Sequence, residues 1–202
     1  MSGVFAASST SSPIIPAYLA NVVGVLKEIE VSAIENVVDI IRSARDRGAF
    51  IYIAGNGGSS STASHWVNDL GKATKRCGRP PLKVMCLSDN TAWFSALSND
   101  EGYERSFAGQ LENFASTGDL LICLSASGNS ANLLRAAELA RSRGVTTVAL
   151  VGFDGGALKT LADVAIWVPT DRGTYEIVED VHSVICHAIT RRLAADWPEP
   201  VR

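Results

Sequence analysis

A turn rich in hydroxyl groups, Ser125-Ala126-Ser127-Gly128-Asn129-Ser130, stands between an apolar run at 120–124 and a helix-like segment at 132–143. A turn that leads from a strand into a helix offers serine hydroxyls, unpaired backbone N–H groups and the positive end of a helix dipole at one point. Together these groups are suited to hold a phosphate. Serine and glycine are also ordinary turn and N-cap residues, so one such turn is explained about equally well without a ligand.

A second turn of similar chemistry, Gly55-Asn56-Gly57-Gly58-Ser59-Ser60-Ser61, follows the apolar run 50–54 and leads into a helical segment at 62–70. Neither turn is followed by Gly-Lys-Ser/Thr, and neither reads G-x-G-x-x-G, so nucleotide binding is not favoured. Two phosphate-type turns in one chain favour a functional role. The sequence therefore predicts binding of a phosphorylated small molecule.

His65 and Asp69 are four positions apart in the segment after the second turn, so a helix would place both side chains on one face. This spacing suits metal ligation or a base held by a partner, although a simple surface contact is the commoner explanation. His182 and His187 are five positions apart, about 140° around a helix, so only one of them is expected to serve the site. The acidic residues before them lie in the first turns of the last helix, where they favourably meet the helix dipole.

Five short apolar runs alternate with helical patterns, which predicts a parallel α/β sheet. The predicted strands are 50–54, 83–87, 120–124, 146–151 and 164–168. In such sheets ligands bind beyond the carboxyl ends of strands, near a switch in strand order, so the two turns can share one site. Apolar faces at 18–47, expected to form one or two helices, and at 174–195 could form a subunit interface.

The composition suits one compact domain: 202 residues, of which 47% are hydrophobic. We expect a loose tail at 1–16 and the domain, with its N-terminal helices, at 17–202. The net charge of −3 argues against a nucleic-acid partner. The four cysteines make no C-x-x-C pair, which is typical of free thiols in a reducing compartment. No secretory leader or membrane span is evident in the sequence. We therefore expect a cytoplasmic protein without a membrane partner.

With these motifs in view, the chain resembles the sugar isomerase (SIS) domain family, and within it the phosphoheptose isomerases. The resemblance covers roughly residues 18–193. Its most specific parts are the two turns, the segment Ser98-Asn99-Asp100 and the segment from Glu179 to His187.

The resemblance implies a flavodoxin-like α/β fold, with a five-stranded parallel sheet flanked by helices and an N-terminal helical extension. It also implies a homo-oligomer, expected to be a tetramer, with sites at subunit interfaces. The implied catalytic base is Asp69 and the implied acid is His187. Zinc-containing members would bind the metal through positions matching His65, Asp69, Glu179 and His187. The implied substrate-binding residues are Asn56, Gly57, Gly58, Ser59, Asp100, Ser125, Ser127, Ser130 and Glu179.

Three departures from the family pattern stand out. Ala126 removes a threonine hydroxyl from the phosphate turn. In the segment 176–180, Glu179 stands at a position usually occupied by glutamine, and the usual arginine is lost. Asp69 replaces the usual glutamate and so has a shorter reach. Glu179 and His187 are also eight residues apart, about 12 Å along an ideal helix, so joint ligation requires their side chains to lean together.

Two hypotheses follow. The first is an aldose–ketose isomerase that acts on a phosphorylated sugar through an enediol. The expected reaction converts sedoheptulose 7-phosphate to a heptose 7-phosphate, with Zn²⁺ as the expected cofactor. The second is a non-catalytic phosphosugar-binding regulator or scaffold, of the type that associates with the replication initiator DnaA. Fold-level resemblance alone does not decide between an enzyme and a regulator.

Overall fold

The computed structural model describes residues 13–75 and 79–195 of the chain. Helix α1 begins at Ile14 and ends at Glu28. Residues 14–16, which were expected to belong to a loose tail at 1–16, are therefore part of this helix. Residues 1–12 of the expected tail lie outside the described residues. Pro16 is tolerated in the first turn of α1 because the N–H group missing from proline has no intrahelical partner there.

All five predicted strands are present, each within a residue of its expected bounds. They are β1 (Phe50–Gly55), β2 (Lys83–Cys86), β3 (Leu120–Ser125), β4 (Thr146–Val151) and β5 (Val164–Trp167). Every pairing is parallel, and the strand order is β2-β1-β3-β4-β5. From β1 the chain first builds outward to β2 and then returns to the opposite side of β1 with β3. The switch in strand order therefore lies between β1 and β3, the two strands that lead into the hydroxyl-rich turns.

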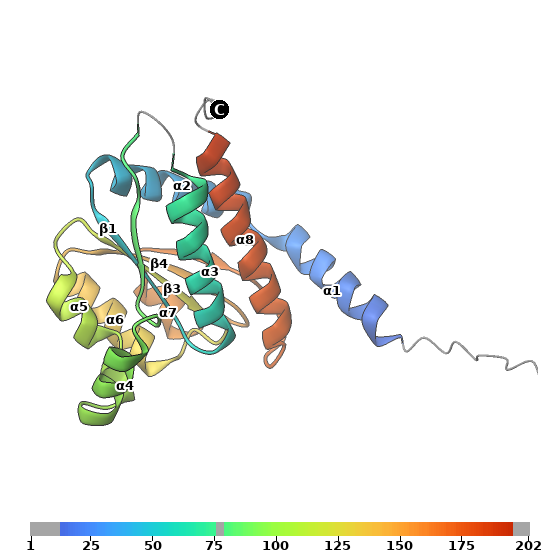
Figure 1. The fold of residues 1–202 in the computed structure, drawn as a ribbon. Coiled ribbons are helices and arrows are strands. Elements are labelled where there is room, and N and C mark those ends of the chain that lie inside the picture. The colour runs from blue at the N-terminus through green and yellow to red at the C-terminus, as the bar shows by residue number, and fades with distance from the viewer. Residues whose placement is uncertain (1–12, 76–78, 196–202) are drawn as a thin grey trace, which may run out of the picture.

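Helices cover both faces of the sheet (Figure 1). One face packs against α2 (Val31–Asp46), α3 (Gly58–Ala73) and α8 (Tyr175–Ala195), and the other against α5 (Ala108–Phe114), α6 (Ala131–Ser142) and α7 (Gly156–Leu161). Side chains alternate between the two cores along each strand, because successive residues of a strand point to opposite faces. On β3, Ile122 packs in the first core and Leu121 in the second.

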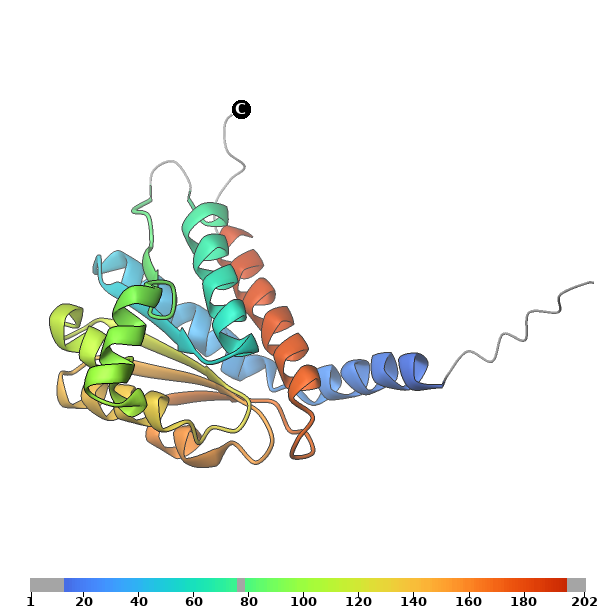
Figure 2. The ribbon, with the colours of Figure 1, turned by 60° about the horizontal axis from the view of Figure 1, so that its bottom comes forward.

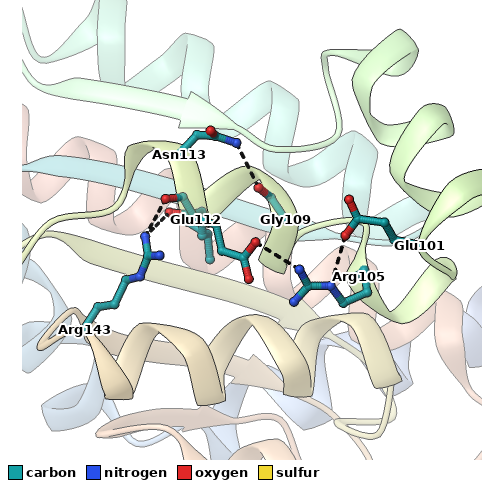
Figure 3. Close-up of polar contacts among 7 residues, drawn as sticks. Glu101, Arg105, Gly109, Glu112, Asn113 and Arg143 are labelled. Atoms are coloured by element: carbon teal, nitrogen blue, oxygen red, sulfur yellow. Dashed lines mark hydrogen bonds and ion pairs between the residues drawn. The ribbon is translucent and has the colours of Figure 1, made fainter.

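The segment between β2 and β3 forms α4 (Thr91–Asp100), the short helix η1 (Tyr103–Arg105) and α5. Arg105 ties these elements together, since its guanidinium contacts Glu101 at 3.2 Å and Glu112 at 2.9 Å (Figure 3). Arg143, after α6, donates to the carbonyl oxygens of Leu111 and Glu112 at 3.0 and 2.7 Å. It thereby satisfies acceptors at the end of α5 that lack helical partners.

Helix α1 extends away from the body of the molecule, as both ribbon views show (Figures 1 and 2). None of its residues is buried, and Ile14, Ile15, Leu19 and Val23 are each more than half exposed. Its clearest polar contact with the body is the Tyr18 hydroxyl, which donates to Asp180 on α8 at 2.6 Å. Among the described residues, no helix has the length and apolar character that crossing a membrane requires.

Candidate functional site

The hydroxyl-rich turn connects β3 to α6, as its sequence predicts. The N–H of Gly128 donates to the Ser125 hydroxyl oxygen at 3.0 Å, and the N–H of Asn129 approaches the Ser127 hydroxyl oxygen at 3.3 Å. Gly128 has φ +62°, and a Cβ built there would stand 2.0 Å from the carbonyl oxygen of Gly155. The turn therefore needs glycine at this position, both for its left-handed backbone and for its close approach to the next loop.

A pocket of about 120 Å³ opens beside this turn. Three helices begin at its edge: α3 in the turn that follows β1, α6 after the turn that follows β3, and α8 at Tyr175. Helix N-termini present free N–H groups and favour anions, so their convergence with serine hydroxyls forms a site suited to phosphate. The lining residues are Asn56, Ser59, Leu124, Ser125, Ala126, Ser127, Ser130, Tyr175 and Glu179.

Asn56 is fixed by a network that the sequence does not reveal. Its side-chain amide exchanges two hydrogen bonds of 2.9 Å with that of Asn132, which is fully buried. The Tyr103 hydroxyl donates to Asn56 Oδ1 at 2.7 Å, and Asn132 also donates to the Ser106 hydroxyl oxygen at 3.1 Å. The sequence gives one indication of this network, which is the position of Asn132 in the first turn of the helix that follows the serine-rich turn at 125–130.

Glu179 lies on the pocket wall against the start of α3. A Cβ built on Gly58 would stand 2.2 to 2.4 Å from the Glu179 carboxyl atoms, so glycine at 58 leaves the room that this side chain occupies. Burial raises the pKa of the Glu179 carboxyl above its usual range, and the nearby carboxylates of Asp180 and Glu176 raise it further. Glu179 therefore retains a proton more readily than an exposed glutamate, which reduces its repulsion of an anion in the pocket.

A second cluster lies further along α3 and α8. His65 Nε2 is 3.6 Å and His187 Nε2 is 3.4 Å from Asp69 Oδ2, and the two imidazole rings meet edge to face at 5.1 Å. One ligand-type atom from each residue lies within 4.8 Å of the others. Two imidazole nitrogens and a carboxylate oxygen are a donor set that zinc and related transition metals accept, so these residues fit a metal ion.

The two helices that carry this cluster are joined directly. Trp66, next to His65 on α3, donates from its indole Nε1 to the hydroxyl oxygen of Thr190 on α8 at 3.1 Å, in a buried contact. Trp66 directly follows His65, and Thr190 is three residues after His187. The pairing of α3 with α8 therefore sets the position of His187 relative to Asp69.

Not every expected site residue joins these two groups. Glu179 lines the pocket and is not among the three residues that form the described cluster. Asp100 is exposed at the end of α4, where its carboxylate accepts from the Asn99 side chain at 2.7 Å, and it lines none of the described pockets near the turns. The chain thus brings together both serine-rich turns, and separately His65, Asp69 and His187.

Tyr175 is a pocket residue that the sequence reasoning missed. It is the first residue of α8 and is 53% exposed. A tyrosine at the start of a helix carries no motif, and only the fold shows that this helix begins beside the phosphate turn.

Comparisons with known proteins agree with this architecture. The chain is 42% identical over 143 residues to the lincomycin biosynthesis protein LmbN of Streptomyces lincolnensis, a match that covers 67% of this chain and about half (52%) of LmbN. It is 39% identical over 156 residues to a phosphoheptose isomerase of Akkermansia muciniphila, covering 77% of this chain and 81% of that protein.

Among solved structures, the phosphoheptose isomerase GmhA from Neisseria gonorrhoeae is similar, with a TM-score of 0.82, 26% identity, and coverage of 90% of this chain and 97% of GmhA. A phosphoheptose isomerase from Francisella tularensis has a TM-score of 0.83 at 25% identity, with coverage of 93% and 100%. The family profile described as the SIS domain matches residues 17–152. Through this match and these relatives, the chain belongs to the SIS domain family.

Proposed function

We propose that this protein is a sugar-phosphate isomerase that interconverts an aldose and a ketose phosphate, with sedoheptulose 7-phosphate as the ketose. The phosphoheptose isomerases among its relatives support this activity and this substrate. The serine-rich pocket supplies the phosphate anchor, and the cluster of His65, Asp69 and His187 supplies groups able to move protons.

The observation that carries the proposal is the arrangement of both groups along the same pair of helices. On α3, Ser59 in the pocket and His65 in the cluster are six residues apart (65 − 59), about 9 Å of helix. A sugar of several carbons with a terminal phosphate spans a distance of this order. A phosphate held at the pocket would therefore place the carbonyl end of the sugar toward Asp69 and His187, and a fixed phosphate reduces the entropy cost of reaching that position.

Proton movements at this cluster account for isomerisation. Asp69 accepts the proton from the carbon next to the carbonyl, while His187 donates a proton to the carbonyl oxygen, which gives an enediol. His187 then accepts the proton of the neighbouring hydroxyl, and Asp69 returns its proton to the former carbonyl carbon. The 3.4 Å separation between His187 Nε2 and Asp69 Oδ2 supports this assignment, because an acid and a base so close together can reach neighbouring atoms of one substrate.

In an alternative mechanism, His65, Asp69 and His187 would instead hold a zinc ion, with Glu179 as the fourth residue implied by the resemblance. When bound, zinc supplies Lewis-acid polarisation of a carbonyl and stabilisation of negative charge. The nearby acidic residue Glu179 reaches the pocket rather than the cluster, so the three-residue set is the better supported part of this proposal.

We also propose that the protein assembles as a homotetramer and acts in the cytoplasm. The exposed apolar face of α1 supports assembly, and three buried, free cysteines (Cys86, Cys123 and Cys186) support a reducing compartment. Cys77 lies outside the described residues.

An isomerisation assay over ketose phosphates of five to seven carbons tests the activity. We expect turnover of sedoheptulose 7-phosphate, with the metal content of the purified protein measured on the same sample. Calorimetric binding of the sugar phosphate without turnover, at full metal occupancy, would favour the regulator hypothesis instead. Absence of both binding and turnover would contradict the proposal.

A further inference from the structure

An aromatic residue with a rare backbone conformation lies behind the phosphate turn. Phe153, in the loop between β4 and α7, has φ +48° and is the one non-glycine residue with positive φ among those the structure describes. Bulky side chains seldom adopt this region, and such backbone outliers concentrate at functional sites, where the surrounding structure holds them in place.

The contacts that hold Phe153 are specific. Its N–H donates to the Thr170 hydroxyl oxygen at 3.2 Å, and its carbonyl oxygen accepts from the indole Nε1 of Trp167 at 2.9 Å. The Phe153 ring is buried and forms a small apolar cluster with Ala126 of the phosphate turn and Val178 of α8. The loop after β4 therefore delivers a fixed aromatic ring to the back of the pocket.

This ring supports Tyr175. The two aromatic rings meet edge to face, with centroids 5.0 Å apart and planes at 81°. The Tyr175 hydroxyl has no hydrogen-bond partner among the described residues, so the ring contact with Phe153 is what orients the side chain. Tyr175 lines the same 120 Å³ pocket as Ser125, Ser127 and Ser130.

We propose that Tyr175 is a specificity-determining wall for the phosphate end of the substrate, and that Phe153 is the positioning residue that holds this wall in place. The inference rests on the proposed function and extends it to two residues outside the motifs of the sequence. The ring of Tyr175 covers one side of the pocket, excludes water from the bound phosphate and contacts the carbon that carries it. Exclusion of water strengthens the hydrogen bonds from the serine hydroxyls and helix N–H groups to the anion.

Calorimetric binding of inorganic phosphate tests the wall directly, because this probe reports on the phosphate end alone and requires no turnover. We expect Tyr175→Ala to weaken phosphate binding about tenfold and to raise KM for sedoheptulose 7-phosphate by a similar factor, with kcat nearly unchanged. Tyr175→Phe should restore both values, since the ring and not the hydroxyl makes the wall.

Phe153→Gly tests the support. Glycine adopts the positive φ without strain, so this change removes the ring while it preserves the path of the loop. We expect Phe153→Gly to weaken phosphate binding in the same direction as Tyr175→Ala, and the double variant to bind about as weakly as Tyr175→Ala alone, because the two side chains act as one unit.

Phe114→Ala is the matched control. It removes an exposed ring from a pair of similar geometry, in which Trp93 and Phe114 are 5.4 Å apart at 73°, away from the pocket lining. This variant should bind phosphate as the unsubstituted protein does. Tyr175 is largely exposed, so its variants should fold, and circular dichroism checks this.

Different results would contradict the role of Tyr175, the role of Phe153 and the proposed function. Unchanged phosphate binding by Tyr175→Ala, or equal weakening by Tyr175→Phe and Tyr175→Ala, would overturn the aromatic wall while leaving isomerase activity intact. Strictly additive losses in the double variant would overturn the positioning role of Phe153. An unsubstituted protein that neither binds inorganic phosphate nor turns over sedoheptulose 7-phosphate would overturn the proposed function and this inference together.

Discussion

Asp69 is the residue on which the proposed chemistry depends, because both imidazoles of the cluster approach the same carboxylate oxygen. His65 Nε2 and His187 Nε2 lie 3.6 and 3.4 Å from Asp69 Oδ2, and the Asp69 side chain is only 22% exposed. One side chain can thus accept a proton from a substrate, or bind a metal ion, with its position fixed from two helices.

Asp69→Asn should abolish isomerisation and spare phosphate binding. The amide preserves the shape of the side chain but does not accept the substrate proton, and loss of a general base lowers the rate about 10²- to 10⁴-fold. The measurement is kcat together with metal content, since a lost ligand would lower zinc occupancy in the same variant. Activity within a few-fold of the unsubstituted protein, at matched metal occupancy, would exclude Asp69 as the base.

His182, in contrast, is a buried histidine outside both groups. Neither ring nitrogen of His182 has a hydrogen-bond partner among the described residues. Burial lowers the pKa of the His182 imidazole to about 4, and the nearby backbone of Val151 partly offsets this lowering. In the unfolded chain the same group titrates near its ordinary value of 6.5. Between these two values the unfolded state binds more protons, so stability falls as pH decreases from 6.5 toward 4.

This difference predicts that protonation of His182 costs the fold about 3 kcal/mol below pH 4, at 1.36 kcal/mol per pKa unit. Denaturant unfolding between pH 7 and pH 4 should show a smaller loss of stability in His182→Leu than in the unsubstituted protein. An NMR titration provides a second measurement on the unsubstituted chain. An imidazole at 182 that gains its proton near pH 6.5 in the folded protein would contradict the prediction.

At the scale of elements, the turn between β3 and α6 depends on one glycine. Gly128→Ala should lower the free energy of unfolding by about 1 to 3 kcal/mol and weaken phosphate binding, because the left-handed backbone and the contact with the Gly155 carbonyl leave no room for a methyl group. Gly71→Ala, in α3, is the control, since its new methyl would meet only Val84 at an ordinary 3.7 Å. Equal stabilities of the two variants would show that the turn tolerates a side chain.

The sequence predicts these elements well because each carries a local signal. Apolar β-branched runs mark the five strands, and the parallel order then brings both serine-rich turns to one edge without any knowledge of side-chain contacts. The pairing of His65 with Asp69 was also predictable, because it depends only on a four-residue helical spacing.

The parts of the site that could not be predicted depend on contacts between distant elements. The meeting of His187 with Asp69 requires α3 and α8 to pack side by side, and here the family resemblance, not spacing, supplied the expectation. Tyr175 and Asn132 belong to the site because of where their helices begin. The separation of Glu179 from the three-residue cluster agrees with its eight-residue distance from His187, which already made joint ligation demanding.

For the molecule as a whole, α1 is the feature that a single chain does not explain. It has an exposed apolar face and no buried residue, and surfaces of this kind seldom remain uncovered in a monomer. The pocket also lacks Asp100, which the family resemblance places near the substrate. In one chain Asp100 is exposed at the end of α4 and does not line the pocket.

We therefore predict that the protein sediments as a tetramer and that charged substitutions on α1 dissociate it. Leu19→Lys combined with Val23→Lys places two charges on the exposed face, and because α1 buries no residue, each chain should still fold. Phe114→Lys, which adds a charge to an exposed apolar position of α5, should leave the assembly unchanged. Sedimentation of the unsubstituted protein only as a 21.4 kDa species at micromolar concentration would contradict the prediction.

If the sites lie between subunits, the α1 variant should lose isomerase activity in proportion to its dissociation, whereas full activity in a monomeric variant would place the whole site within one chain.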